Sequence, residues 1–343
     1  MDRYDRQKRV RQIGPAGQAK LQQATILIVG VGGLGSYAAA ALARAGVKRL
    51  ILVDPDVVSL TNLQRQALFT EDDCLHRRFK VAAAKDHLRE INNTVEVMAI
   101  PSPLTTDIIV DNQFDLCLDC LDNYGARDLL NQLAIKYNFD YLFASCAGSY
   151  GNVMAVSPRE HPCLNCVFPN LDDLKQADCD LIGVNTALLP LIAGMQVSLA
   201  LHYLVDRATI DFDHLITYDN WSMAANKFKV NKRTDCPSCQ EDRPTVNQQD
   251  GSQQLRMLCG ENAFYIRLSL PIELTAWVAY LKHAGLLKGS SPLFIHFSWH
   301  QRPVSLFRNG KLIMYDLPDR KNADQQLASL TKLAQSLTKE GKS

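Results

Sequence analysis

The sequence predicts an α/β protein with a Rossmann-like, doubly wound sheet that binds a nucleotide at the carboxyl ends of its strands, followed by a small α+β domain. Residues 24–54 read as strand, glycine turn, helix and strand, and they end in Asp54. The Cys-x-x-Cys pairs at 163–166 and 236–239 lie far apart in the chain, as in a structural metal site. A polar stretch, 241–254, separates a last segment with its own strand and helix patterns.

Composition and charge narrow the class of protein. The chain has 343 residues and a formal net charge of +1. This near-neutral charge gives no electrostatic attraction to nucleic acid or to a charged membrane surface. The N-terminus has no apolar signal segment, and the ten cysteines of such a chain are better interpreted as thiols or metal ligands than as disulfides. We expect a cytoplasmic protein with neither a nucleic-acid partner nor a membrane.

One apolar stretch, 187–205, is long enough to cross a membrane. It contains Pro190, Gln196 and His202, and it stands alone in the chain. A helix buried in the core or at a subunit interface is therefore the preferred interpretation, with a membrane span as the alternative.

The glycine turn follows a buried strand over 25–29 and precedes an alanine-rich helix over 36–45. Backbone N–H groups at such a turn form a site for phosphate oxygens, and the Asp54 carboxylate can accept hydrogen bonds from ribose hydroxyls. Because NAD, FAD and ATP enzymes share this turn, the glycines leave open which nucleotide binds, and even whether they only permit a tight turn. The turn glycines are Gly30, Gly32, Gly33 and Gly35.

A polar segment, 55–66, follows Asp54 at the edge where open α/β sheets bind their ligands. Its Asn62, Gln64 and Arg65 are therefore expected to reach a bound nucleotide. The next helical pattern, 81–92, opens with Lys80, whose ammonium group is expected near the same edge, although a surface lysine is the ordinary case.

Three further strands are predicted, at 95–100, 114–121 and 140–146, with a helix over 124–137 and a continuation of the sheet over 153–156. The fourth strand of this sheet, 114–121, ends in Asp122-Asn123. Asp119 and Asp122 therefore share the strand-end region, where a carboxylate beside phosphates is what a Mg²⁺ ion needs.

The two Cys-x-x-Cys pairs predict a structural zinc site. Each pair lies in a loop, where both thiolates can turn inward, and four sulfurs complete a tetrahedral Zn²⁺ site with no open position for catalysis. Two reduced, unrelated pairs and a redox dithiol are the alternatives. Cys179, in a polar loop between the pairs, is either an activated nucleophile or an incidental free thiol. The expected zinc ligands are Cys163, Cys166, Cys236 and Cys239.

The chain is expected to divide into a nucleotide-binding domain over 1–240, a linker over 241–254 and a small α+β domain over 255–343. We find no catalytic constellation in the sequence of the last domain, so its role stays open. Its predicted strands are 263–269, 293–298, 303–307 and 312–315, and its predicted helices are 272–284 and 323–337.

A series of motifs runs through the first domain in order: Arg3-Tyr-Asp-Arg6-Gln, the glycine turn, Asp54-x-Asp56, Asn62-Leu-Gln-Arg65-Gln, Lys80, Asp119-Cys-Leu-Asp122-Asn123, both Cys-x-x-Cys pairs and Cys179. Together they resemble the ThiF/MoeB adenylyltransferases, the bacterial relatives of the ubiquitin-activating enzymes. The tail domain looks more like that of the longer, thiamine-type members than the shorter, molybdopterin-type ones.

The resemblance implies a reaction and its substrates. Such enzymes use ATP and Mg²⁺ to adenylate the C-terminal glycine of a ubiquitin-like sulfur-carrier protein of ThiS or MoaD type, which ends in Gly-Gly, in thiamine or molybdopterin cofactor biosynthesis. The glycine carboxylate attacks the α-phosphorus and gives an acyl-adenylate and pyrophosphate. A carboxylate that attacks a polyanion needs its charge repulsion cancelled and its reactants aligned, which is the work of Lys, Arg and Mg²⁺.

The resemblance also implies roles for individual residues. Asp54 holds the ribose, and Asp122 holds the magnesium. Arg6 reaches the triphosphate from the other subunit of a homodimer, whereas Arg127 is a candidate only by its place after Asp122. The phosphate-holding residues are Asn62, Arg65 and Lys80, and the turn glycines, Asp56, Gln64 and Asn123 complete the expected nucleotide contacts.

Three questions remain open at this point. A cysteine at the place of Cys179 links covalently to the carrier in thiamine-type members and is dispensable in molybdopterin-type ones. The tail has no Cys-centred loop of a fused sulfurtransferase, so the sulfur would come from a separate sulfurtransferase or cysteine desulfurase. A NAD(P)- or flavin-dependent oxidoreductase is the alternative, but it leaves Arg65, Lys80 and four thiolates without a role, and polar site residues argue against a non-catalytic binding module.

Overall fold

The computed structural model describes residues 2–169, 171, 183–239, 255–258, 263–268, 272–290, 294–308 and 310–340. The predicted linker 241–254 and Cys179 lie outside these residues. The chain separates into two units, Met1–Val246 and Asn247–Ser343, and each is described by itself.

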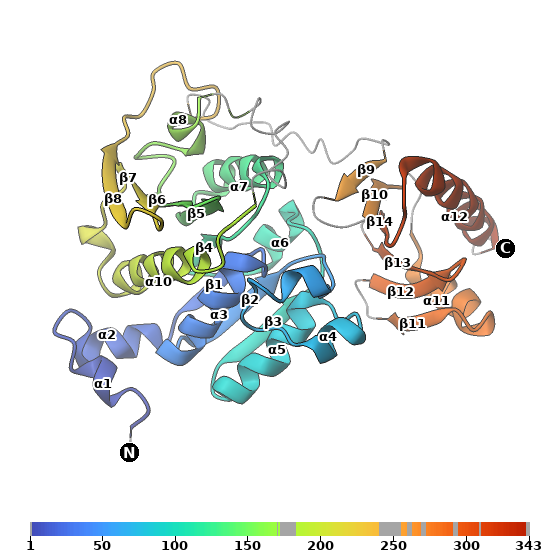
Figure 1. Ribbon diagram of the computed structural model, residues 1–343, viewed down its shortest axis with the longest axis horizontal. Coiled ribbons are helices and arrows are strands. Elements are labelled where there is room, and N and C mark those ends of the chain that lie inside the picture. The colour runs from blue at the N-terminus through green and yellow to red at the C-terminus, as the bar shows by residue number, and fades with distance from the viewer. Residues whose placement is uncertain are drawn as a thin grey trace. The chain divides into compact units, whose positions relative to one another are not determined.

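The first unit is built on an eight-stranded sheet with the order β3-β2-β1-β4-β5-β6-β7-β8 (Figure 1). The strands from β3 to β5 in this order are parallel, whereas β6, β7 and β8 pair antiparallel. The strand order reverses between β1 and β4, the point at which α/β sheets bind ligands, and the predicted doubly wound sheet is confirmed. The strands are β1 (Thr25–Val29), β2 (Arg49–Val53), β3 (Glu96–Ile100), β4 (Leu116–Asp119), β5 (Tyr141–Ala147), β6 (Tyr150–Val156), β7 (His214–Asp219) and β8 (Ala224–Lys229).

Helices cover both faces of this sheet because its parallel strands are apolar on both sides. Ile26 and Ile28 of β1 face the core under α3, α5 and α10, whereas Leu27 and Val29 face the core on the side of α6 and α7 (Figure 1). The helices of the first unit are α1 (Asp5–Lys8), α2 (Gly14–Leu21), α3 (Gly33–Ala45), α4 (Glu71–Leu75), α5 (Lys80–Ile91), α6 (Thr106–Asp111), α7 (Tyr124–Tyr137), α8 (Leu164–Val167) and α10 (Leu188–Val205), with short 3-10 turns at η1 (Leu60–Asn62) and η3 (Arg207–Thr209).

The apolar stretch 187–205 forms α10. Among the described residues, α10 is the one helix that meets the length and composition expected of a membrane span, with a mean hydropathy of 1.7. It packs against α3, β5 and β6, and its fully buried Gln196 donates hydrogen bonds to the carbonyls of Asp119, at 3.0 Å, and Leu142, at 2.8 Å. The face of α10 that carries Gln196 therefore lies in the protein core, as predicted for this apolar stretch.

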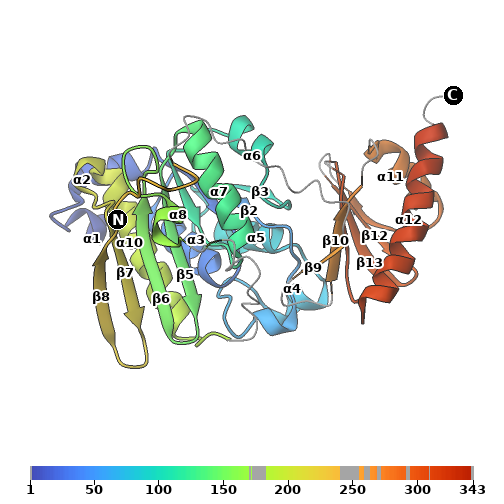
Figure 2. The same cartoon turned by 90° about the horizontal axis from the view of Figure 1, so that it is seen from above.

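The second unit holds a six-stranded sheet with the order β11-β12-β13-β14-β10-β9, in which all pairs are antiparallel. Two helices cover one face of it (Figure 2). Trp277 and Leu330, one from each helix, share a buried cluster with Phe297 and Leu306 of the sheet. The elements are β9 (Arg256–Leu258), β10 (Ala263–Arg267), α11 (Leu274–His283), β11 (Leu287–Ser290), β12 (Phe294–Trp299), β13 (Arg302–Phe307), β14 (Lys311–Met314) and α12 (Arg320–Glu340).

The hairpin of β7 and β8 is not predicted by the sequence pattern. All residues of β8 are exposed, so the strand lacks the apolar alternation that marks a half-buried strand. Its existence depends on pairing with β7, which in turn pairs with β6. This is a case where tertiary context decides the local structure.

Candidate functional site

The glycine turn brings β1, α3 and the end of β4 into close contact. Gly30 has a φ of 89°, and a Cβ there would lie 2.5 Å from the carbonyl oxygen of Cys120. A Cβ at Gly35 would lie 1.9 Å from the carbonyl oxygen of Gly30. Glycine is therefore required at both positions by the fold itself.

Gly32 differs from these two glycines. It has a negative φ and is the N-cap of α3, and a Cβ there would meet only Nε2 of Gln66, at 3.6 Å. No atom of the described residues therefore crowds the space beside Gly32. Its backbone lies at the N-terminus of a 13-residue helix, where the N–H groups and the helix dipole favour an anion.

Asp54 lies directly behind the glycine turn. Its carboxylate accepts hydrogen bonds from the backbone N–H groups of Val31, at 2.7 Å, and Asp56, at 2.9 Å. Burial raises the pKa of Asp54 to about 6, while the positive charge of Lys80 opposes this shift. Each carboxylate oxygen has a further lone pair, so the group can hold the turn and still accept a hydrogen bond from a ribose hydroxyl.

Lys80 is held beside Asp56 at the same edge of the sheet. Its Nζ lies 2.9 Å from Oδ2 of Asp56, and its backbone N–H donates to the Asp56 carbonyl, also at 2.9 Å. Only 6% of Lys80 is exposed, so it is not a surface lysine. The first turn of α5 is thereby joined to the connection that follows β2.

The polar segment after β2 forms η1 and a turn, and its side chains are partly engaged by the protein itself. Arg65 donates to the carbonyl of Thr61 at 2.8 Å, and Oε1 of Gln64 accepts from the Thr186 hydroxyl at 2.6 Å. The side-chain oxygen of Asn62 accepts the Ser59 N–H, as part of the cap of η1. Arg65 also approaches the glycine turn through its backbone, because a Cβ on Gly33 would lie 4.0 Å from its carbonyl oxygen.

Gln66 is a residue of this edge that sequence reasoning did not select. Only 4% of it is exposed, and its Oε1 has no hydrogen-bond partner among the described residues. Its amide nitrogen is the atom nearest to the open side of Gly32. The available signal was its place next to Arg65 in the same motif.

Two carboxylates at the end of β4 lie in different environments. Asp119 is fully buried, and burial raises its pKa to about 6 against the opposing charge of Arg127. One oxygen of Asp119 accepts the Leu121 N–H at 3.1 Å, and the other has no hydrogen-bond partner among the described residues. Asp122, by contrast, is exposed, and Asn123 donates to it at 3.2 Å. Of the two, Asp122 is accessible to a hydrated Mg²⁺ ion.

Arg127 lies beneath the strand end and is only 3% exposed. Its guanidinium group stacks over the Phe143 ring at 4.9 Å, lies 4.0 Å from Asp119 and donates to the Leu121 carbonyl. Its positive charge therefore stabilises the buried carboxylate of Asp119.

Arg6 is not brought together with the other predicted residues of the same chain. It is exposed on α1, and α1 packs at the far end of α3, where Tyr4 contacts Gly46 and Gln7 donates to the Ala45 carbonyl at 3.0 Å. A helix of this length spans about 20 Å, with the glycine turn at its other end. Within one chain, Arg6 and the glycine turn lie at opposite ends of α3.

The four cysteines of the two Cys-x-x-Cys pairs form one cluster, with all sulfurs within 4.8 Å of one another. Adjacent sulfurs are 3.6 to 3.9 Å apart. Sulfurs bound at about 2.3 Å in a tetrahedral zinc site would be about 3.8 Å apart, so the cluster fits this metal. The Arg233 N–H also donates to the Cys166 sulfur at 3.4 Å, a contact that suits a thiolate ligand.

The chain is similar to known proteins over most of its length. The model of the ThiF family matches residues 4–238. The chain is 34% identical over 328 residues to the sulfur carrier protein ThiS adenylyltransferase of Bacillus subtilis (strain 168), which covers 92% of this chain and 95% of that protein. It is 32% identical to the protein of the same name from Escherichia coli (strain K12), over 69% of this chain and 94% of that protein.

A solved structure shares the fold. The crystal structure of E. coli MccB with ATP superimposes with a TM-score of 0.60 at 21% identity, over 70% of this chain and 74% of that one. The alignment with the Bacillus protein is longer than the first unit, which ends at Val246, so it includes part of the second unit.

Proposed function

The chain belongs to the ThiF family, and we propose that it adenylates the C-terminal glycine of a ubiquitin-like sulfur-carrier protein at the expense of ATP. It is a nucleotidyltransferase, as the names of its relatives indicate. The observation that carries this proposal in the structure is the combination of the open backbone at Gly32 with the ion pair between buried Lys80 and partly exposed Asp56 at the same edge. An oxidoreductase is not favoured, because this family membership and the polar edge then have no explanation.

In the proposed reaction, a carboxylate oxygen of the carrier's terminal glycine forms a bond to the α-phosphorus of ATP. The bond between that phosphorus and the oxygen bridging to the β-phosphate breaks, and pyrophosphate leaves. We assign the phosphates to the N-terminus of α3 and to Asn62, Arg65 and Lys80, and the ribose to Asp54. Mg²⁺, when bound at Asp122, would neutralise phosphate charge that otherwise repels the incoming carboxylate.

The buried side chains of Lys80 and Asp54 contribute to the transfer through their fixed positions. Lys80 is fixed by Asp56, so its ammonium group needs little reorganisation when charge develops on the leaving pyrophosphate. Asp54 fixes the turn through Val31, which sets the direction of the backbone N–H groups. Preorganisation of this kind lowers the free energy of the transition state relative to bound substrates.

Several finer assignments belong to the same proposal. The cysteine cluster holds a structural Zn²⁺ ion, and Arg6 reaches the triphosphate from the other subunit of a homodimer, since it lies far from the glycine turn of its own chain. Cys179 is a candidate for a covalent link to the carrier, and the sulfur comes from a separate sulfurtransferase or cysteine desulfurase. The location is the cytoplasm, and the carrier is of ThiS or MoaD type.

The test is exchange of radioactive pyrophosphate into ATP. We expect exchange only when a carrier with a free Gly-Gly terminus is present, and none with a carrier that lacks its last glycine. Asp122→Asn and Lys80→Ala should each lower the rate about 100-fold or more, the scale of losing one charge that stabilises a transition state. Exchange that continues without any carrier would refute the proposal.

A further inference from the structure

We propose that Asp73, which lies outside the nucleotide edge, is a positioning residue for the Lys80–Asp56 pair and acts on it through Arg78. This inference rests on the proposed function, because it concerns a residue that would not touch ATP itself. It assigns a role to a buried carboxylate that none of the sequence motifs includes.

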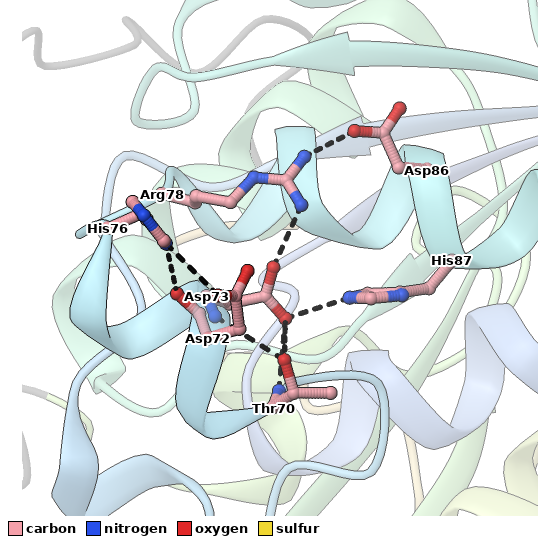
Figure 3. Close-up of polar contacts among 7 residues, drawn as sticks. All are labelled: Thr70, Asp72, Asp73, His76, Arg78, Asp86 and His87. Carbon is pink, nitrogen blue, oxygen red and sulfur yellow. Dashed lines mark hydrogen bonds and ion pairs between the residues drawn. The ribbon is translucent and has the colours of Figure 1, made fainter.

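Asp73 is the centre of a polar network between α4 and α5 (Figure 3). Its carboxylate is buried and accepts hydrogen bonds from Nε2 of His87 at 2.7 Å, from the hydroxyl of Thr70 at 2.9 Å and from Nη1 of Arg78 at 2.9 Å. The Thr70 N–H donates as well, at 3.0 Å, which completes the cap of α4. Burial alone would raise the pKa of Asp73, but the hydrogen bonds from His87 and Thr70 outweigh it and lower the pKa below its ordinary value.

The network fixes a sharp turn that leads directly to Lys80. Arg77 has a φ of 47°, a left-handed conformation that is unfavourable for a non-glycine residue. The turn is held on its far side by Arg78, which binds Asp73 through both its guanidinium group and its backbone N–H, the latter at 3.0 Å from the Asp73 carbonyl. A substitution of the Asp73 side chain leaves this backbone bond in place and removes the contact that fixes the Arg78 guanidinium group beside the turn.

Beyond the turn, three backbone contacts align the two segments that carry the Lys80–Asp56 pair. The Val58 N–H donates to the Arg78 carbonyl at 2.8 Å, Val57 and Phe79 form a β-bridge, and the Lys80 N–H donates to the Asp56 carbonyl at 2.9 Å. From one contact to the next, the chain that follows Arg78 advances by one residue, while the paired segment after β2 runs back by one. Movement of Arg78 therefore shifts the backbone of Lys80 against that of Asp56, and the distance between their charged groups changes with it.

The matched control is Asp86, the other carboxylate on the same guanidinium group (Figure 3). Its side chain is 62% exposed, whereas that of Asp73 is 1% exposed. An exposed ion pair is worth little, and within the described part of the chain the ion pair of Asp86 ends at the Arg78 guanidinium group. Asp86→Asn removes a charge from Arg78 without removing the support of the turn.

The experiment measures the dissociation constant of ATP by titration calorimetry in a double-mutant cycle. We expect Asp73→Asn to weaken binding about tenfold in the wild-type background and less than twofold in a Lys80→Ala background, since its effect passes through Lys80. Asp86→Asn should stay within twofold of the wild type. If Asp73→Asn does not fold, Arg78→Gln takes its place in the cycle, because that side chain is 30% exposed.

The outcomes separate the two claims. An equal loss in both backgrounds would show a general structural role and overturn the inference, as would an Asp73→Asn variant that binds ATP like the wild type. A wild-type protein that binds no ATP would overturn the proposed function instead. Coupling between Asp73 and Lys80 with a silent Asp86 would support the inference.

Discussion

Replacing Arg127 with methionine tests how the buried carboxylate of Asp119 is stabilised. Methionine fills the apolar part of the arginine site but removes the charge that lies 4.0 Å from Asp119 and the hydrogen bond to the Leu121 carbonyl. We expect the first unit to lose about 3 kcal/mol of its free energy of unfolding at pH 7, the lower end for breaking a buried ion pair.

The expected loss of unfolding free energy is the sum of a further electrostatic cost at Asp119 and the loss of the contacts that Arg127 makes itself. Burial raises the pKa of Asp119 from 3.8 to about 6, which corresponds to about 3 kcal/mol of destabilisation already present at pH 7. When Arg127 is absent, the carboxyl group takes up a proton at pH 7, so the further cost of its charge is limited to about 1.4 kcal/mol. The lost hydrogen bond to Leu121 and the lost contact with the Phe143 ring contribute about 1–2 kcal/mol more.

The sign of the pH dependence follows from the direction of the shift. The folded-state pKa of Asp119 lies above the unfolded value, so the folded protein binds this proton more tightly than the unfolded chain does. The stability that comes from the protonated carboxyl group is therefore complete below pH 4 and is lost as the pH rises through 6. At pH 5 Asp119 is mostly protonated both in the wild type and without Arg127. The loss caused by Arg127→Met should therefore be about 1 kcal/mol smaller at pH 5 than at pH 7.

The assay is urea unfolding followed by far-ultraviolet circular dichroism at both pH values. Trp277 provides an internal reference, because it is buried in the second unit, whereas Trp221 of the first unit is 82% exposed. The fluorescence transition of the second unit should not move. If Arg127→Met lowers the free energy of unfolding equally at pH 5 and pH 7, the protonation of Asp119 does not limit the loss. If the loss is below 0.5 kcal/mol, Arg127 does not stabilise the buried carboxylate.

Three further predictions concern the proposed ATP and zinc sites. Since burial raises the pKa of Asp54 to about 6, the KM for ATP should rise as the pH falls below 6, and Asp54→Asn should remove this step from a pH profile. Gly32→Ala should abolish ATP binding in calorimetry with little change in melting temperature, whereas Gly35→Ala, whose Cβ would lie 1.9 Å from a carbonyl oxygen, should also cost about 2 kcal/mol or more of stability. Metal analysis should find about one zinc ion per chain, and a chelator or Cys236→Ser should lower the melting temperature of the first unit; protein without zinc but with unchanged stability would contradict this.

The sequence was sufficient for the parts of the fold that rest on strong local patterns. Buried parallel strands are continuous apolar runs, so β1 could be placed over 25–29, where it is observed. The two Cys-x-x-Cys pairs could be joined into one cluster because metal-ligand spacing is itself a local signal, although the chain between them is long.

Other parts of the site depend on tertiary contacts that no local pattern carries. Thr70 and Asp73 cap α4 in the structure, but nothing in the sequence indicates that Arg78 and His87 converge on the same carboxylate. The position of Arg6 at the far end of α3 follows from how α1 packs on that helix, which the charge pattern of the N-terminal arm does not determine.

The candidate site is assembled from connections that hold one another in place. Parallel strands bring their carboxyl ends to one edge, and here Gly30 contacts Cys120 after β4, while Asp54 after β2 binds the turn after β1. Substitutions at such buried contacts should therefore weaken ATP binding and stability together. Asp122 is exposed, and the hydrogen bond that it accepts among the described residues comes from its neighbour Asn123. Its removal should therefore change the rate of adenylation while the free energy of unfolding stays the same. This difference separates a residue that acts on the substrate from those that shape the site.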